Sequence, residues 1–175
     1  MAMRAKSLAI FVAVALIGCA PALSAPNLAS ITIKSEHNVV KIGDDVKIEI
    51  ILKNLSDRAI GLDLVNAAPD HAEFNYNIQM TTPEGKSASR TEYGTSILPD
   101  HDIVHNADGI YTFHISSYAF IDLNSKEELQ GSVNLEKIFA ISEPGSYLVN
   151  VSNKIRVARE IQNITSNTIL LIIEK

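Results

Sequence analysis

The segment that most constrains the fold of this chain is residues 46–53, where apolar and charged residues alternate. The apolar members are Val46, Ile48, Ile50 and Leu52, and the charged members are Lys47, Glu49 and Lys53. Successive side chains of an extended chain point to opposite faces, so this alternation predicts a half-buried β-strand. Turn-forming residues flank the segment at 43–45 and 54–57. The segment therefore predicts a strand with defined ends, but it indicates no chemistry.

Further short segments either alternate in the same way or are rich in apolar and β-branched residues, and turn residues separate them. They are residues 31–34, 39–42, 59–65, 73–81, 110–121, 129–135, 147–151 and 168–173. After residue 25 there is no heptad pattern, no repeat of fixed period and no long helical periodicity. Short strands with turn signals between them predict an all-β protein, an antiparallel β-sandwich of about 7–9 strands.

The connecting segments are less regular. Residues 82–85 predict a tight turn that ends at Gly85 in the left-handed conformation. Residues 87–97 are expected to extend back along the preceding strand, and residues 99–109 to form a polar loop. Residues 136–142 are expected to form one helical turn that crosses between the sheets.

Residues 1–25 have the layout of a secretory signal, in which Arg4 and Lys6 precede an apolar run. Residues 16–19 resemble a bacterial lipobox. In that case residues 1–18 are the signal peptide, Cys19 is lipidated, and residues 19–28 form a flexible tether. Alternatively, the signal peptide is residues 1–25, or ends at residue 22, and Cys19 is removed with it. In both cases residues 29–175 are expected to form the folded domain.

The charge of the chain bears on its partners. The formal net charge is -5, and the sequence has no run of basic residues. Nucleic-acid-binding surfaces are built from clustered Lys and Arg, so nucleic acid is not expected as a partner. Cys19 is the only cysteine, which excludes an internal disulfide and a cysteine-based zinc site.

Several segments occur together in a characteristic order. They are Glu-Phe-Asn-Tyr at 73–76, Gly-Lys at 85–86, Thr-Glu-Tyr-Gly at 91–94, Pro-Gly-Ser-Tyr at 144–147 with Val149, Val151 and Ser152, and Ser-Asn-Thr-Ile at 166–169. This set resembles a group of uncharacterised exported bacterial proteins, and the resemblance implies an immunoglobulin-like sandwich over roughly residues 30–175. Such proteins often carry Leu-x-Pro-Gly-Glu where residues 123–127 are Leu-Asn-Ser-Lys-Glu.

The segments around Gly43 and at 54–56 are more remotely similar to small sandwich domains related to a bacillar intracellular proteinase inhibitor. Neither resemblance implies a catalytic residue.

One cluster could bind a metal ion, since His101 and His105 lie beside Asp100 and Asp102. Two histidines four residues apart come close enough to bind one metal ion on a helix, where they lie on adjacent turns, and Pro99 disfavours a helix here. We therefore expect a polar surface loop. No nucleophile elbow, P-loop or zincin helix is present in the sequence, so no catalytic residue, cofactor or enzymatic activity is expected.

Tyr147 follows the turn formed by Pro144 and Gly145, where β-sandwiches often have a tyrosine corner. Its hydroxyl is expected to bond to the backbone of residues 135–140. The roles of Tyr147, Pro144, Gly145 and Gly85 are expected to be structural.

The last predicted strand is apolar on both faces, with Leu170 and Ile172 on the outer one. Ile51 interrupts the polar face of residues 46–53 in the same way. The outer face of an antiparallel sandwich normally contacts water. Either residues 87–121 cover these side chains, which is the simpler expectation, or they form an exposed patch where another envelope protein docks.

These observations favour a non-catalytic binding or scaffolding module with an unknown ligand. If Cys19 is lipidated, Ala20 after it indicates an outer-membrane lipoprotein facing the periplasm. Otherwise the protein is expected to be soluble in the periplasm or secreted. An alternative is a proteinase inhibitor that acts through an exposed loop such as residues 95–110, and a further one is a metal-binding envelope enzyme that uses His101 and His105. The expected partner is another envelope protein or a protease, with membrane contact only through the lipid anchor.

Overall fold

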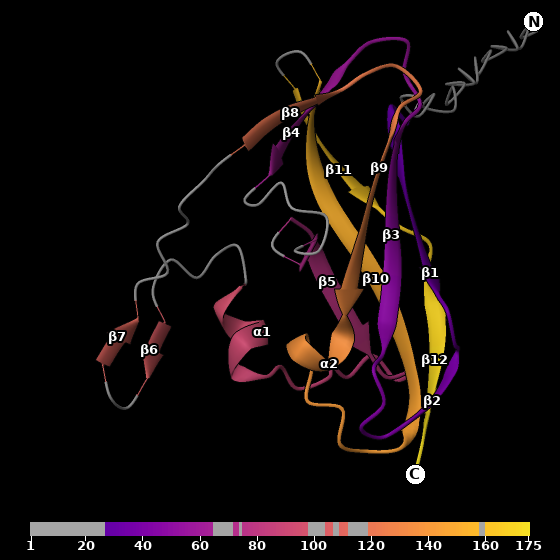
Figure 1. The fold of residues 1–175 in the computed structure, drawn as a ribbon, viewed down its shortest axis with the longest axis vertical. Helices are drawn as coiled ribbons and strands as arrows, with labels where there is room; N and C mark the ends of the chain where they lie inside the picture. The colour runs from indigo at the N-terminus through magenta and orange to yellow at the C-terminus, as the bar shows by residue number, and fades with distance from the viewer. Residues whose placement is uncertain are drawn as a thin grey trace, which may run out of the picture.

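The computed structural model describes residues 27–64, 72–73, 75–97, 104–106, 109–111, 119–157 and 160–175. Most of these residues form a three-stranded and a seven-stranded β-sheet that pack face to face (Figure 1). A single apolar cluster, to which both sheets contribute, fills the space between them. The predicted all-β sandwich is therefore confirmed.

The smaller sheet contains β1 (Ala29–Ser35), β3 (Lys47–Asn54) and β9 (Glu128–Asn134), in the order β1-β3-β9. Both pairings are antiparallel. The strand predicted at residues 46–53 is β3, which begins one residue later than predicted. The side chains predicted to face inward are at most 1% exposed. They are Val46, Ile48, Ile50 and Leu52. Burying each such side chain contributes about 1.5–3 kcal/mol, so this strand supplies a large share of the core.

The larger sheet is built around β10 (Gly145–Val157), a strand of 13 residues. Its order is β2-β12-β10-β4-β8, and β5 and β11 also pair with β10. The other strands are β2 (Val39–Lys41), β4 (Ile60–Leu64), β5 (Asn77–Thr81), β8 (Ala119–Leu123), β11 (Glu160–Thr165) and β12 (Ile169–Glu174). The first half of β10 pairs with β12 and β5, and the second half pairs with β11 and β4.

This strand order is that of an immunoglobulin-like sandwich, in which strands A, B and E share one sheet and strands C, F and G share the other. β1, β3 and β9 take the places of A, B and E, while β4, β10 and the β11–β12 segment take those of C, F and G. β2 departs from the expected antiparallel arrangement, because it pairs with β12 in parallel. Within the described part of the chain, no strand takes the place of D beside β9.

β11 is not predicted from the sequence, because Ile161 and Ile164 are three residues apart and break the period of two. The strand forms a hairpin with β10 and is then followed by a bulge. Residues 166–168 face only two residues of β10, since Thr165 pairs with Ser152 and Ile169 pairs with Val149. β12 continues from there along the same edge of β10.

The tight turn predicted at residues 82–85 is confirmed. The Gly85 N–H donates to the Thr82 carbonyl at 2.9 Å, and Gly85 has a φ of 86°, which is the left-handed conformation that glycine adopts without strain. The strand before this turn is shorter than predicted, because β5 begins at Asn77 instead of residue 73.

Two short helices lie next to each other at one end of the sandwich (Figure 1). The return strand predicted at residues 87–97 is wrong beyond Ala88, whose N–H donates to the Met80 carbonyl. The chain then forms α1 (Glu92–Ser96), which begins at a capping threonine, Thr91. α2 (Leu135–Ile138) is the helical turn predicted at 136–142, but it begins one residue earlier and ends four residues earlier.

The polar loop predicted at residues 99–109 contains part of a β-hairpin instead. β6 (Val104–Asn106) pairs with β7 (Gly109–Tyr111), and His105 is opposite Ile110. The strand predicted at residues 110–121 corresponds to β7 and to the start of β8.

His101, Cys19 and the predicted signal peptide lie outside the described residues. In the part of the chain that is described, no helix is both long and apolar enough to cross a membrane.

Candidate protein-interaction surface

Three large apolar side chains are exposed together on the outer face of the larger sheet. The exposed fractions are 51% for Val39, 47% for Leu170 and 38% for Ile172. Ile172 pairs with Val39 across β2 and β12, and Leu170 lies two residues along β12 on the same face. We call these three residues the β2–β12 patch. The simpler expectation from the sequence, that residues 87–121 cover Leu170 and Ile172, is wrong.

The exposure of the patch does not come from poor packing of β12. On the opposite face of this strand, Leu171 and Ile173 are only 0% and 2% exposed. Those two side chains face the core, as the sequence predicts. β12 therefore has two apolar faces, and the described fold buries only one of them.

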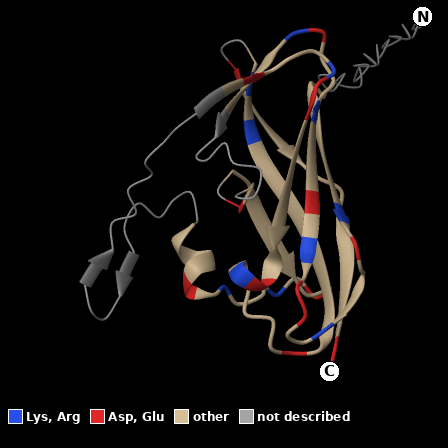
Figure 2. Ribbon diagram, viewed as in Figure 1, with Lys and Arg blue, Asp and Glu red and all other residues tan. Residues whose placement is uncertain are grey.

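The β2–β12 patch has an apolar neighbour on one side and charged residues on the other. Half-buried Leu148 pairs with Leu170 and extends the apolar surface onto β10. At the other end Lys41 pairs with Glu174, which places opposite charges side by side at the rim. Figure 2 shows that, in the described part of the chain, Lys, Arg, Asp and Glu are interspersed over strands, turns and helices.

Ile51 does not belong to this patch. It lies on the smaller sheet, where its neighbours across the strands are Thr32 and Gln130. Its side chain is half-buried and faces away from the core, because Ile50 and Leu52 face inward. The three residues predicted to share a partner surface therefore lie on two different sheets.

Tyr147 forms a different contact from the predicted one. Its hydroxyl donates to the Glu143 carbonyl at 3.1 Å, four residues upstream, and not to residues 135–140. The ring is half-buried against the core and follows the exposed Pro144 and Gly145. Tyr147 therefore stabilises the turn that precedes it. It does not bond to residues 135–140, which connect the two sheets.

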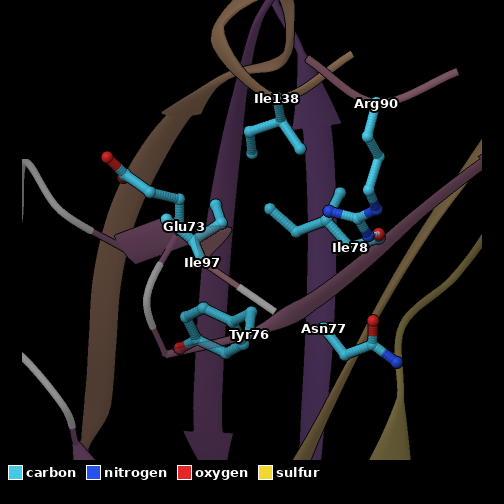
Figure 3. A pocket seen from close by; sticks show the side chains of 7 residues that line it. All are labelled: Glu73, Tyr76, Asn77, Ile78, Arg90, Ile97 and Ile138. Atoms are coloured by element: carbon cyan, nitrogen blue, oxygen red, sulfur yellow. Dashed lines mark hydrogen bonds between the residues drawn. The ribbon is translucent and has the colours of Figure 1, made fainter. Parts of the chain in front are cut away.

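A small cavity lies between β5 and the two helices (Figure 3). It is lined by Glu73, Tyr76, Asn77, Ile78, Arg90, Ile97 and Ile138, and its volume is about 10 Å³. That volume holds about one water molecule. The Glu73 carboxylate points away from the Arg90 guanidinium in this view. The cavity is too small for a substrate or an organic ligand.

The ionisable groups around this cavity are perturbed by burial. Glu73 is 7% exposed and accepts a hydrogen bond from the Tyr93 hydroxyl at 2.9 Å. Burial raises the pKa of Tyr93, and the hydrogen bond and negative charge of Glu73 raise it further. Burial alone raises the pKa of Tyr76 to about 12 and lowers the pKa of Arg90. The raised pKa values keep the phenols of Tyr76 and Tyr93 protonated to a higher pH than an exposed phenol would be.

The Thr-Glu-Tyr-Gly segment at residues 91–94 has a packing role here. The Thr91 hydroxyl accepts from the Gly94 N–H at 2.8 Å and so caps α1. Gly94 touches the backbone of Ile138 in α2, and a Cβ at this position would overlap its carbonyl group. The preceding residue, Arg90, lies over the Phe139 ring at 5.0 Å. The segment therefore joins the two helices.

The sequence suggested an alternative metal site at His101 and His105. The described residues contain no group of three or more His, Cys, Asp or Glu side chains that could hold a metal ion. Of the predicted histidine pair, only the backbone of His105 is described, in β6.

No family model matches the sequence, and no curated protein matches it either. Among solved structures, a CARDB domain from Pyrococcus furiosus in complex with di-metal ions has a TM-score of 0.40 and 14% identity, over 83% of this chain and 87% of that chain. A β-glucosidase from Listeria innocua in complex with glucose has a TM-score of 0.39 and 10% identity, over 84% of this chain and 16% of that chain.

The periplasmic chaperone SfaE has a TM-score of 0.34 and 14% identity, over 83% of this chain and 57% of that chain. Likenesses at these scores and identities carry no argument about function. The fold assignment rests on the strand order of the chain itself.

Proposed function

We propose that this protein is a non-catalytic binding module of the cell envelope, which docks another envelope protein at the β2–β12 patch. The observation that carries the proposal is the joint exposure of Val39, Leu170 and Ile172 on the outer face of the larger sheet. A face of this kind normally contacts water and is polar. A cluster of exposed apolar side chains with a charged rim is typical of a protein-interaction site.

The location of the module depends on the N-terminal residues. The lipobox-like residues 16–19 and the short Pro/Ala/Ser segment after them support a lipidated Cys19 with a tether to the folded domain. Such an anchor holds the sandwich near a membrane without any membrane-spanning helix. The envelope location is therefore part of the proposal.

The test compares three substitutions of exposed apolar residues by lysine. Leu170→Lys and Ile172→Lys place a charge in the patch, while Ile161→Lys makes the same kind of change outside it, at a residue that is 64% exposed. Because none of these sites is buried, all three variants should keep the unfolding free energy of the wild type within about 1 kcal/mol. After cross-linking in intact cells, the two patch variants should lose a partner that the wild type and Ile161→Lys retain.

The opposite results have distinct meanings. If all four proteins cross-link to the same partners, the patch is not the docking surface. If the partner is a protease, and if its binding survives both patch substitutions but is lost on changes within residues 95–110, the protein acts as a proteinase inhibitor.

A further inference from the structure

The smaller sheet ends at β9, and no strand among the described residues pairs with its outer edge. The backbone hydrogen bonds at the two ends of the β3–β9 pairing show which N–H and C=O groups of β9 point away from β3. The Asn54 N–H donates to the Glu127 carbonyl, and the Leu135 N–H donates to the Val46 carbonyl. Antiparallel ladders alternate, so the odd-numbered residues of β9 bond to β3. The N–H and C=O groups of the even-numbered residues point to the open edge, and these residues are Glu128, Gln130, Ser132 and Asn134.

Two other edges of the sandwich are closed by side chains. The Asn167 amide accepts from the Ile33 N–H at 2.9 Å and donates to the Ile33 carbonyl at 3.1 Å, which blocks the edge of β1. The Arg90 guanidinium donates to the Ile78 carbonyl at 2.7 Å on β5. Among the residues that the structure describes, no side chain covers β9 in this way. β9 also has no proline and no bulge, and its one charged residue is Glu128. An edge without these features is a template for another strand.

We infer that a second copy of this chain pairs with β9, in an antiparallel β9–β9 contact whose twofold axis passes beside Gly131. Gly131 is the middle residue of the seven in β9. In this register Gln130 is opposite the partner's Ser132, and Glu128 is opposite the partner's Asn134. No two like charges meet. The outward N–H and C=O groups of each strand bond to those of the other, as an isologous interface requires.

The inward face of β9 supports the same register. Leu129 faces the core, because it pairs with buried Leu52, yet it remains half-buried. In the twofold pair Leu129 lies opposite the partner's Val133, so a second apolar side chain covers its exposed part. The two smaller sheets then form one continuous sheet with a shared apolar inner face.

The first experiment removes one outward donor. Ser132→Pro deletes an N–H that points to the open edge and leaves the β3–β9 ladder intact. In sedimentation equilibrium the wild type should dimerise, and Ser132→Pro should raise the dissociation constant at least about tenfold. Ser132→Ala keeps the N–H and is the matched control, which should dimerise like the wild type. A wild-type dissociation constant above about 1 mM, or an unchanged constant in Ser132→Pro, would overturn the proposal.

The second experiment tests the register. Gln130→Lys with Ser132→Lys places lysines opposite each other across the axis and should weaken the dimer about tenfold. Gln130→Lys with Ser132→Glu places opposite charges there and should preserve it. Equal dissociation constants for the two double variants would exclude the twofold register.

Loss of the dimer in Leu170→Lys, with no effect of Ser132→Pro, would place the second copy on the β2–β12 patch instead and overturn the proposal.

Discussion

Gly94 is restricted by the backbone opposite it, since any side chain would overlap the carbonyl of Ile138. The two helices approach each other this closely only because residue 94 lacks a Cβ. Gly94→Ala should therefore lower the unfolding free energy by at least about 2 kcal/mol, as packed backbone must move. In Gly61→Ala the new Cβ would meet its nearest atom at 3.6 Å, so this control should change stability by less than about 1 kcal/mol. Urea unfolding measures both, and equal losses would contradict the packing argument.

Tyr76 should make the stability of the protein sensitive to high pH. Its pKa is raised to about 12 by burial, whereas an unfolded tyrosine has a pKa of about 10. The folded state therefore holds the proton more tightly. The resulting stability is complete below about pH 10 and is lost as the pH rises toward about 12.

Urea unfolding at a series of alkaline pH values tests this. The unfolding free energy of Tyr76→Phe should fall less steeply than that of the wild type, because one phenol no longer ionises on unfolding. The remaining slope includes Tyr93, whose pKa is raised by burial and by Glu73. Identical slopes for the wild type and Tyr76→Phe would show that Tyr76 does not carry the effect.

At the scale of elements, the bulge between β11 and β12 connects the two sheets. Asn167 lies in this bulge, and its amide bonds to both main-chain groups of Ile33 on β1. Asn167→Ala should lower the unfolding free energy by about 1–3 kcal/mol, since two hydrogen bonds are lost and their partners are left at a half-buried edge.

Hydrogen exchange gives a local measure of the same contact. The Ile33 amide should exchange faster in Asn167→Ala than in the wild type, because its acceptor is gone. Asn163→Ala, at an exposed position of β11, is the matched control and should leave that amide unchanged. Protection of Ile33 that survives Asn167→Ala would mean that another group closes this edge.

At the scale of the whole molecule, the proposed lipid anchor determines where the sandwich is found. A diacylated Cys19 binds membranes firmly, whereas a single acyl chain binds only marginally. The wild type should therefore fractionate with membranes, and Cys19→Ser should move it to the soluble periplasmic or secreted fraction. A soluble wild type whose N-terminus follows residue 22 or residue 25 would contradict lipidation and leave ordinary secretion.

The sequence by itself determined the sandwich and the face that each clearly alternating strand buries. Alternation with a period of two is a local property, so β3 and β5 could be assigned an inner face before any partner strand was known. α2 and the turn at Gly85 were also predictable, because each depends on a few adjacent residues. β11 and α1 were not. The isoleucines of β11 do not alternate, and α1 depends on the close contact between Gly94 and Ile138, which is distant in sequence.

The tertiary structure alone decided what lies over each outer face and edge. Leu170, Ile172 and Ile51 looked equivalent in the sequence, because all three interrupt a face that should contact water. The sheet order places Ile51 half-buried on the smaller sheet and leaves the other two exposed beside Val39. The partner of Tyr147 and the open edge of β9 were decided in the same way. These features depend on which distant segment pairs with which strand, and local periodicity contains no information about that choice.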